Sequence, residues 1–86
     1  MDTYTDRMEA ALSKQIRVEI VERGITQKAL AESMGIGRPS LNHYLTGHRS
    51  MTAESFFKLT EAIGVAPSVL LGKAEERLTE RPDPMA

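Results

Sequence analysis

The stretch from Gln27 to Gly47 constrains the fold of this 86-residue chain more than any other segment. It contains two short helical patterns on either side of a single glycine, Gly35, with apolar residues only where two crossed helices would meet. These apolar residues are Leu30, Met34, Ile36, Leu41, Tyr44 and Leu45. The small Ala31 lets the second helix approach the first closely, and Gly35 can adopt the positive φ of a sharp helix-to-helix turn. The pattern predicts a helix-turn-helix, whose second helix can enter the major groove of DNA.

These residues resemble the helix-turn-helix of the phage lambda repressor and Cro family, the XRE-type prokaryotic regulators. The family's small residue falls on Ala31, its turn glycine on Gly35, and its apolar positions on five of the residues just named. A looser likeness continues to Leu71, because residues 52–64 resemble the family's fourth helix and residues 67–71 its short fifth. The resemblance implies a sequence-specific transcriptional regulator, a repressor that occupies an operator on double-stranded DNA. One departure is Gly37, where many members have a capping serine or threonine.

The rest of the chain predicts an all-α, compact five-helix domain of the lambda-repressor type. We expect residues 1–5 to be flexible and residues 6–72 to form the DNA-binding domain. Its helices should span about 6–23, 27–33, 38–46, the stretch between Thr52 and Gly64, and 67–71. Residues 73–86 should be a charged C-terminal tail, partly helical or disordered, in which Ala74 to Leu78 can form a turn or two of helix.

The composition excludes several classes of protein. The absence of cysteine excludes disulfides, a thiol nucleophile and cysteine-based zinc sites. No apolar run approaches the ~20 residues needed to cross a bilayer, and no signal peptide is visible, so we expect a cytoplasmic protein that associates with the nucleoid through DNA. His43 and His48 lack a third metal ligand with convincing spacing. We therefore expect no enzyme activity, metal, cofactor, small-molecule substrate or membrane partner.

The charge is unevenly distributed along the chain. Residues 23–58 carry five basic side chains and two acidic ones, a net charge of +3, whereas the whole chain has a net charge of −1. Each flanking segment carries three basic and five acidic side chains. The positive charge is therefore concentrated on the helix-turn-helix, as a surface that faces phosphate requires, although chance segregation on a solvated surface is the alternative.

The predicted recognition helix, residues 38–46, has one polar face. At 100° per residue, Pro39, Asn42, His43 and Thr46 lie opposite the three apolar side chains Leu41, Tyr44 and Leu45, and Arg38 lies at the edge of the polar face. Arginine pairs with the O6 and N7 acceptors of guanine, and asparagine with N6 and N7 of adenine. We therefore predict base contacts for the following residues: Arg38, Pro39, Asn42 and His43. The alternative is an ordinary solvated helix face.

A second set of residues is predicted to contact phosphate. Members of the family use a glutamine at the start of the second helix to hold a backbone phosphate, and this position is Gln27 here, where free N–H groups at the helix start could assist. The family also contacts phosphate from the loop after the recognition helix, which here carries His48 and Arg49. The full set is Gln27, Lys28, Ser40, Thr46, His48 and Arg49. Such contacts position a protein on DNA without specifying sequence.

One recognition helix covers only ~4–5 base pairs, so we expect a homodimer on a two-fold-related operator. The dimer contact should come from helix five and the Ala74–Leu78 segment, with Leu70, Leu71 and Leu78 as its apolar patch. The alternative function is an antitoxin-like or accessory protein-interaction module with the same fold. Val18 and Val21, which fall off the main apolar stripe of the first helix, leave room for such a partner.

Overall fold

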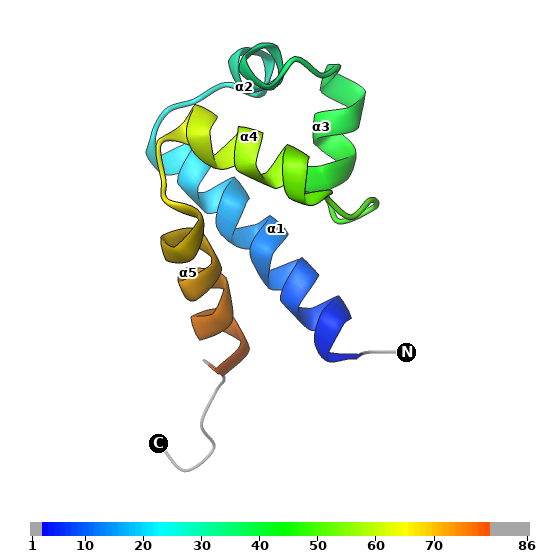
Figure 1. The fold of residues 1–86 in the computed structure, drawn as a ribbon, viewed down its shortest axis with the longest axis vertical. Helices are drawn as coiled ribbons and strands as arrows, with labels where there is room; N and C mark the ends of the chain where they lie inside the picture. The colour runs from blue at the N-terminus through cyan, green and yellow to red at the C-terminus, as the bar shows by residue number, and fades with distance from the viewer. Residues whose placement is uncertain (1–2, 80–86) are drawn as a thin grey trace.

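A computed structural model describes residues 3–79, and this part of the chain contains five α-helices and no strand. The helices are α1 (Tyr4–Glu22), α2 (Gln27–Met34), α3 (Arg38–Leu45), α4 (Ala53–Ile63) and α5 (Pro67–Thr79). α1 and α5 run antiparallel beside each other, and α2 and α3 gather at the end of the molecule remote from the start of α1 (Figure 1). α4 packs against both α2 and α5. The expected all-α architecture of five helices is confirmed.

Threonine caps begin three of the helices. Thr3 and Asp6 form a reciprocal capping box, in which Thr3 Oγ1 accepts from the Asp6 N–H at 3.1 Å and Asp6 Oδ2 accepts from the Thr3 N–H at 3.3 Å. This box starts α1 at Tyr4, two residues before the expected Asp6, so Tyr4 and Thr5 belong to the helix. Thr26 and Thr52 cap α2 and α4 as their side chains accept from the N–H three residues ahead.

The fifth helix differs from its expected extent. α5 does not end before Gly72 but continues to Thr79, so the first part of the expected charged tail is helical. A glycine inside a helix costs about 1 kcal/mol relative to alanine, and contacts with α1 outweigh this cost. Ala74 is fully buried, and Arg77 Nε donates to Gln15 Oε1 at 2.7 Å. Residues 80–86 of the expected tail, like residues 1–2, lie outside the described residues.

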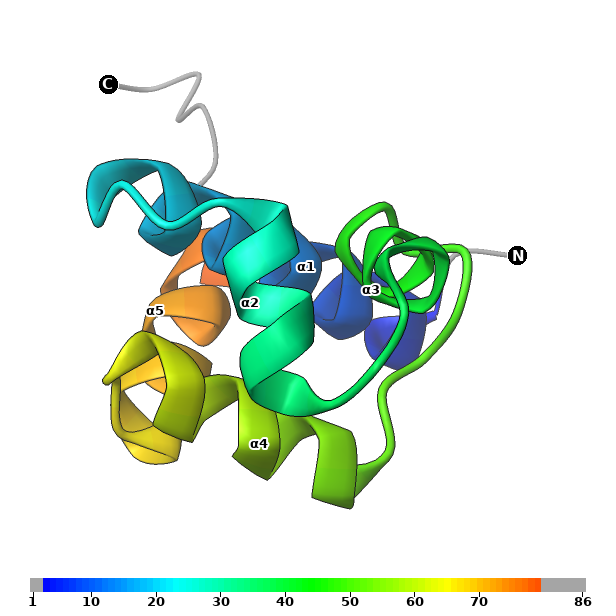
Figure 2. The same ribbon diagram turned by 90° about the horizontal axis from the view of Figure 1, so that it is seen from above.

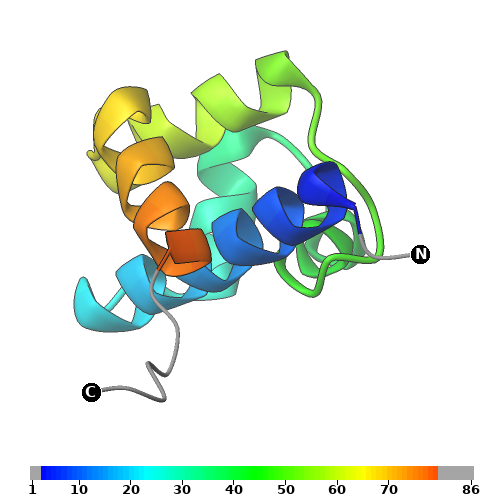
Figure 3. The same ribbon diagram turned by 90° about the horizontal axis from the view of Figure 1, so that it is seen from below.

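A single apolar core contains residues from all five helices. Figures 2 and 3 show the arrangement of these helices from above and from below. The least exposed large apolar members of the core are Ile16, Leu30, Leu41, Leu45, Leu59 and Leu70. Adjacent apolar residues differ in their burial. Phe56 is buried but Phe57 is 57% exposed, and Leu70 is buried whereas its neighbours Val69 and Leu71 are 48% and 39% exposed. On each of these helix turns another residue, Phe56 or Leu70, already faces the core.

A buried polar network joins α1 to α5. Glu19 is only 2% exposed, and its carboxylate accepts hydrogen bonds from Gln15 Nε2 at 2.8 Å, Arg23 Nε at 3.2 Å and Lys73 Nζ at 3.0 Å. The Lys73 ammonium lowers the pKa of Glu19 below its ordinary value of 4.5, against the opposing effect of desolvation. The network is thus satisfied only when α5 continues past Gly72 and delivers Lys73 to α1.

We predict that Glu19→Gln lowers the free energy of unfolding at neutral pH by about 1–3 kcal/mol. The expected loss of stability is smaller than for a fully buried ion pair, because solvent screens the side chains of Lys73 and Arg23, which are 45% and 41% exposed. The folded-state pKa of Glu19 is lowered, so its contribution is complete above the unfolded value of 4.5 and is lost as the pH falls through the folded value. Urea unfolding followed by circular dichroism between about pH 3 and pH 7 should therefore show a shallower acid decline for the variant.

The control is Glu54→Gln, which removes an exposed carboxylate 3.9 Å from Lys58. An exposed pair of this kind contributes little, so the stability of this variant should stay within about 0.5 kcal/mol of the parent. Equal effects of the two substitutions would contradict the role given to Glu19.

Candidate nucleic-acid interface

α3 buries one face and exposes the other. Leu41, Tyr44 and Leu45 are 1%, 7% and 1% exposed, and they pack toward the core. The side chains on the opposite face all reach solvent, as the 100° spacing predicted. In Figure 2, α3 is seen nearly along its axis beside α2, at the end of the molecule where no other helix covers it.

The turn before α3 has the predicted geometry. Gly35 ends α2 with φ of 70°, the left-handed conformation that a residue with a Cβ adopts only with strain. The N–H of Gly35 donates to the carbonyl of Glu32, and the N–H of Ile36 donates to that of Ala31 at 3.0 Å. These bonds close α2 in a Schellman-type turn and direct the chain into α3 across Gly37.

The residues predicted to contact bases lie together on the exposed face of α3. Arg38, Pro39, Asn42 and His43 are all exposed. Within residues 3–79, the side chains of Arg38 and Asn42 make no hydrogen bond, so their donors and acceptors are free for a ligand. The His43 ring lies 6.2 Å, centroid to centroid, from the His48 ring. Their exposure satisfies the first requirement for base contact, and the contacts themselves stay predictions.

The residues predicted to contact phosphate lie at three locations: the start of α2, the first turn of α3, and the end of α3 with the loop after it. Gln27 and Lys28 are exposed in the first turn of α2, where the backbone N–H groups of a helix start point outward. Ser40 is half-buried in the first turn of α3 and so is less accessible than the others. The third location is the end of α3 and the loop after it, where three exposed side chains follow one another: Thr46, His48 and Arg49.

This loop is held by local contacts. Thr46 is not part of α3 as expected but is its C-cap, and its Oγ1 donates to the Asn42 carbonyl at 2.8 Å. The same hydroxyl lies 2.7 Å from His48 Nδ1. The Arg49 guanidinium carbon lies 5.9 Å from the centroid of the Tyr44 ring, within the range of a cation–π contact. The loop therefore presents its two basic side chains from a defined position.

The basic residues of the segment 23–58 divide into two groups. Arg23 is paired with Glu19, and Lys58 with Glu54. Lys28, Arg38 and Arg49 form no ion pair with any other residue of the described range 3–79. Unpaired cations on an exposed surface are available to phosphate and base acceptors. The positive charge noted in the sequence is thus carried, around α2 and α3, by three side chains without an ion pair to any described residue.

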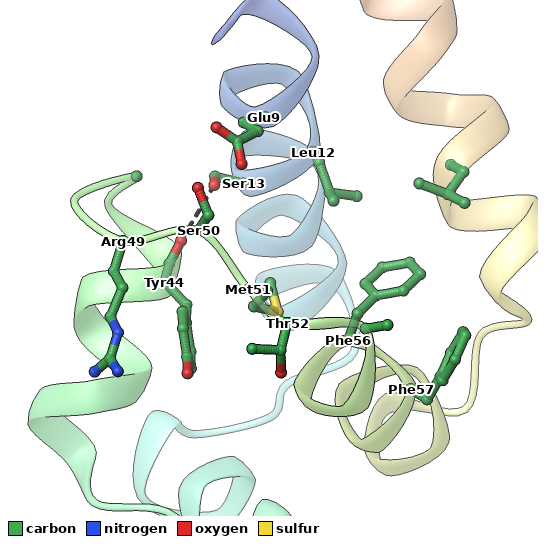
Figure 4. A pocket seen from close by; sticks show the side chains of 13 residues that line it. Glu9, Leu12, Ser13, Tyr44, Arg49, Ser50, Met51, Thr52, Phe56 and Phe57 are labelled. Atoms are coloured by element: carbon green, nitrogen blue, oxygen red, sulfur yellow. Dashed lines mark hydrogen bonds between the residues drawn. The ribbon is translucent and has the colours of Figure 1, made fainter. Parts of the chain in front are cut away.

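Two polar residues of α1 contact the end of α3, and neither was predicted from the sequence to have a role at the site. Ser13 Oγ donates to the Tyr44 carbonyl at 3.1 Å, and Arg17 Nη1 donates to the Leu45 carbonyl. Figure 4 shows the first of these bonds as a dashed line. Ser13 and Arg17 are four residues apart and so lie on one side of α1, next to the apolar stripe. That spacing was the available signal, but it does not reveal which helix crosses there.

A cleft of about 320 Å³ lies beside this contact, between α1, the loop after α3, α4 and α5 (Figure 4). Its apolar lining comes from Leu12, Met51, Phe56, Phe57 and Leu71. Phe57 and Leu71 are the exposed members and stand at its mouth. Among residues 3–79 there is no group of three or more histidine, cysteine or acidic side chains placed to hold a metal ion. No helix in the same range has the length and apolar character to cross a membrane.

A family model described as helix-turn-helix matches residues 14–70, and the chain belongs to this family. The chain is 37% identical over 68 residues to the antitoxin HigA-1 of Vibrio cholerae, which covers 78% of this chain and 64% of that protein. It is 32% identical over 65 residues to the HTH-type transcriptional regulator ImmR of Bacillus subtilis, which covers 76% and 51%. The chain thus spans between about half and two-thirds of the length of these relatives.

The fold also matches a solved structure. The clp gene regulator ClgR from C. glutamicum superimposes with a TM-score of 0.79 at 20% sequence identity, over 86% of this chain and 96% of that one. This likeness extends beyond the helix-turn-helix and shows that the two chains share the arrangement of their helices. The expected relationship to this family is confirmed.

We predict that Gly37→Ser stabilises the domain by about 0.5 kcal/mol. Gly37 is the N-cap of α3, with φ of −75° and ψ of 154°, and no side chain caps this helix. An added Cβ would meet only Pro39 Cδ, at 3.6 Å, so a serine fits and can accept the Ser40 N–H. Thermal unfolding of both proteins measures the difference.

The matched control is Gly35→Ser, which places the same side chain at a φ of +70° two residues earlier. Strain there should lower stability by about 1 kcal/mol, although nothing lies within 4 Å of the added Cβ. A loss of stability at both positions would mean that the start of α3 has no room for a cap.

Proposed function

We propose that this protein is a sequence-specific regulator of transcription that binds double-stranded DNA and represses by occupying an operator. The observation that carries the proposal is the exposed face of α3, which holds Arg38, Asn42 and His43. The side chains of the first two have no hydrogen-bond partner within residues 3–79. Membership of the helix-turn-helix family and the relative named as a transcriptional regulator support the proposal. Such a protein acts in the cytoplasm, on the nucleoid.

In this proposal α3 enters the major groove with its first turn nearest the bases. Arg38 is at the helix start and can form two hydrogen bonds with guanine, and Asn42 is one turn further and can do the same with adenine. His43 can donate to a base acceptor or to phosphate, and Pro39 offers only apolar contact, for example with a thymine methyl group. These residues would determine which sequence is bound.

The phosphate contacts flank this face. Gln27 and Lys28 would hold one phosphate at the start of α2, where the free N–H groups of the helix also point. Thr46, His48 and Arg49 would hold a second phosphate beyond the end of α3, with Ser40 between the two groups. Contacts on both sides of α3 would fix its register in the groove without reading sequence.

The proposal is tested by selecting bound sequences from a random duplex pool and then measuring Kd on the selected site and on a scrambled duplex. Arg38→Ala and Asn42→Ala should each cost ~1–3 kcal/mol on the selected site and little on the scrambled one. Lys28→Ala and Arg49→Ala should weaken both duplexes about equally. Each of these two should also reduce the slope of log K against log salt by ~1.

The two pairs of variants serve as controls for each other, because each removes polar groups from exposed positions of the same surface. Selection of no duplex at about 50–100 mM salt would overturn the proposal. If Arg38→Ala leaves the specificity ratio unchanged, α3 is not the part of the molecule that reads the bases.

We further propose that the protein binds its operator as a homodimer. The apolar patch expected on helix five must be revised, because Leu70 and Ala74 are fully buried in the protomer. Phe57 on α4 and Leu71 on α5 are exposed instead, and both stand at the mouth of the cleft, away from the outward face of α3. A second copy that covers these two side chains would leave both recognition helices free.

We predict that Phe57→Lys weakens the dimer by about tenfold or more, since it places a charge where an apolar side chain would be buried. Sedimentation velocity at several concentrations measures this change. Affinity for a site with two half-sites, about 10–10.5 base pairs apart, should fall while affinity for one half-site stays the same.

The control is Val21→Lys, which makes the same kind of change on α1 at a side chain that is 79% exposed. It should leave self-association unchanged. If Val21→Lys weakens the dimer and Phe57→Lys does not, the two copies meet through α1.

The second candidate function is that of an antitoxin-like protein that binds another protein. The observation that favours it is the 37% identity to a relative named as an antitoxin. Val21, exposed on α1, and the half-buried Val18 offer an apolar surface for such a partner. Failure of the random-pool selection to yield a duplex would favour this function over the first.

A further inference from the structure

We propose that Ser13 and Arg17 of α1 are positioning residues for the recognition helix: they hold the C-terminal end of α3 and thereby set which bases its first turn reaches. The proposal rests on the proposed function, because it concerns how α3 is presented to DNA. Neither residue belongs to the surfaces assigned above to bases or phosphates.

The carbonyls at the end of α3 accept hydrogen bonds from groups outside the helix. An α-helix leaves the carbonyls of its last turn without partners inside the helix, and each must bond to something else or to water. The Asn42 and His43 carbonyls accept from backbone N–H groups of the following loop, at 2.9 and 3.2 Å. The Tyr44 carbonyl accepts from Gly47 at 3.3 Å and also from Ser13 Oγ at 3.1 Å.

The Leu45 carbonyl, the last of α3, differs from the others. Within residues 3–79 its partner is a side chain of another helix, Arg17, and no backbone N–H is bonded to it. The guanidinium also brings a positive charge to the negative end of the α3 dipole. Arg17 is thus the residue that joins the final carbonyl of the recognition helix to α1.

The start of α3 has no comparable support. Its N-cap is Gly37, which makes no side-chain hydrogen bond, and Pro39 in the first turn has no N–H to be capped. The helix is therefore fixed at its C-terminal end by α1 and by its own apolar face. Small changes at that end are transmitted to the start of the helix, where Arg38 lies.

The length of α3 converts a small tilt into a loss of base contact. Arg38 and Leu45 are seven residues apart, which corresponds to ~10 Å along the helix at ~1.5 Å per residue. A tilt of about 10° around the C-terminal end would move the Arg38 backbone by roughly 2 Å. A hydrogen bond lengthened by that much is lost.

Arg17 is suited to a test because its own exposure is high while Ser13 is buried. Loss of the Arg17 side chain lets water reach the Leu45 carbonyl, so the fold should persist. The preference of the protein for its selected DNA sequence should therefore fall more than the stability of the domain. A residue that merely stabilised the domain would lower both together.

The experiment measures Kd on the selected duplex and on a scrambled duplex for Arg17→Ala, Ser13→Ala and the double variant. Arg17→Ala should lower the ratio of the two affinities by about tenfold, at the low end of what one bidentate base contact supplies, while binding to scrambled DNA changes by less than about threefold. The double variant should lose more. Arg17→Lys keeps a donor and the charge, so it should restore most of the ratio.

Lys14→Ala is the matched control, because it removes one exposed positive charge from the same helix at a side chain with no ion pair within residues 3–79. It should leave the specificity ratio unchanged. If Arg17→Ala instead weakens both duplexes equally, Arg17 is a phosphate contact and the proposal is overturned. An unchanged ratio in the double variant would overturn it as well.

Amide hydrogen exchange on the DNA-free protein separates this proposal from the proposed function. Arg17→Ala should accelerate exchange at the amides of residues 42–47 by about tenfold or more, with α5 unaffected. This result would support the bracing of α3 even if no duplex were selected. Uniform acceleration throughout the domain would assign Arg17 a general structural role and refute the positioning role.

Discussion

The structure depends on the burial of one face of α3 against the rest of the domain. A helix of eight residues is too short to be stable in water alone, so α3 exists because Leu41, Tyr44 and Leu45 have a core to enter. The same apolar contact decides which face stays outside. Folding and the presentation of the polar face are therefore one event, and any change that loosens the core also disorganises the surface proposed to read DNA.

Charged side chains are paired in one part of the molecule and unpaired in another. At the α1–α5 contact the charges satisfy each other, because Glu19 is surrounded by donors from both helices. Around α2 and α3 the described cations have no such partners. A field from unpaired charges attracts a polyanion over a distance, whereas a buried and neutralised network fixes a helix in place. The slightly negative chain thus retains a positive end.

The features that were predicted best from the sequence are those determined by residues close to them in the chain. Gly35 was predicted at the turn because the turn needs a residue with positive φ. The caps formed by Thr26 and Thr52 have equally local causes, since each side chain accepts from an N–H three residues ahead. The continuation of α5 through Gly72 was not predicted, because its cause is tertiary: Ala74 and Lys73 contact α1. Adjacent apolar pairs were also ambiguous, since a pattern alone does not say whether Phe56 or Phe57 turns inward.

The candidate site shows the same division. Helical spacing predicted correctly which residues of α3 reach solvent, since that depends only on the period of the helix. The contacts of Ser13 and Arg17 with α3 could not be predicted, because they depend on where two helices cross. The roles of Arg38, Asn42 and the other residues assigned to bases and phosphates are still predictions, since exposure is necessary for contact but does not establish it.

The placement of the two ends of the described chain has a consequence for modular architecture. Tyr4, at the start of α1, and Thr79, at the end of α5, line the same shallow pocket, at the end of the molecule opposite α2 and α3 (Figure 1). Ends that are close together and remote from a binding surface tolerate fusion. A sensor, a fluorescent reporter or a second binding module joined at either end would begin on the side away from α3, and the two junctions would be near enough for this domain to be inserted as a cassette into a loop of another protein.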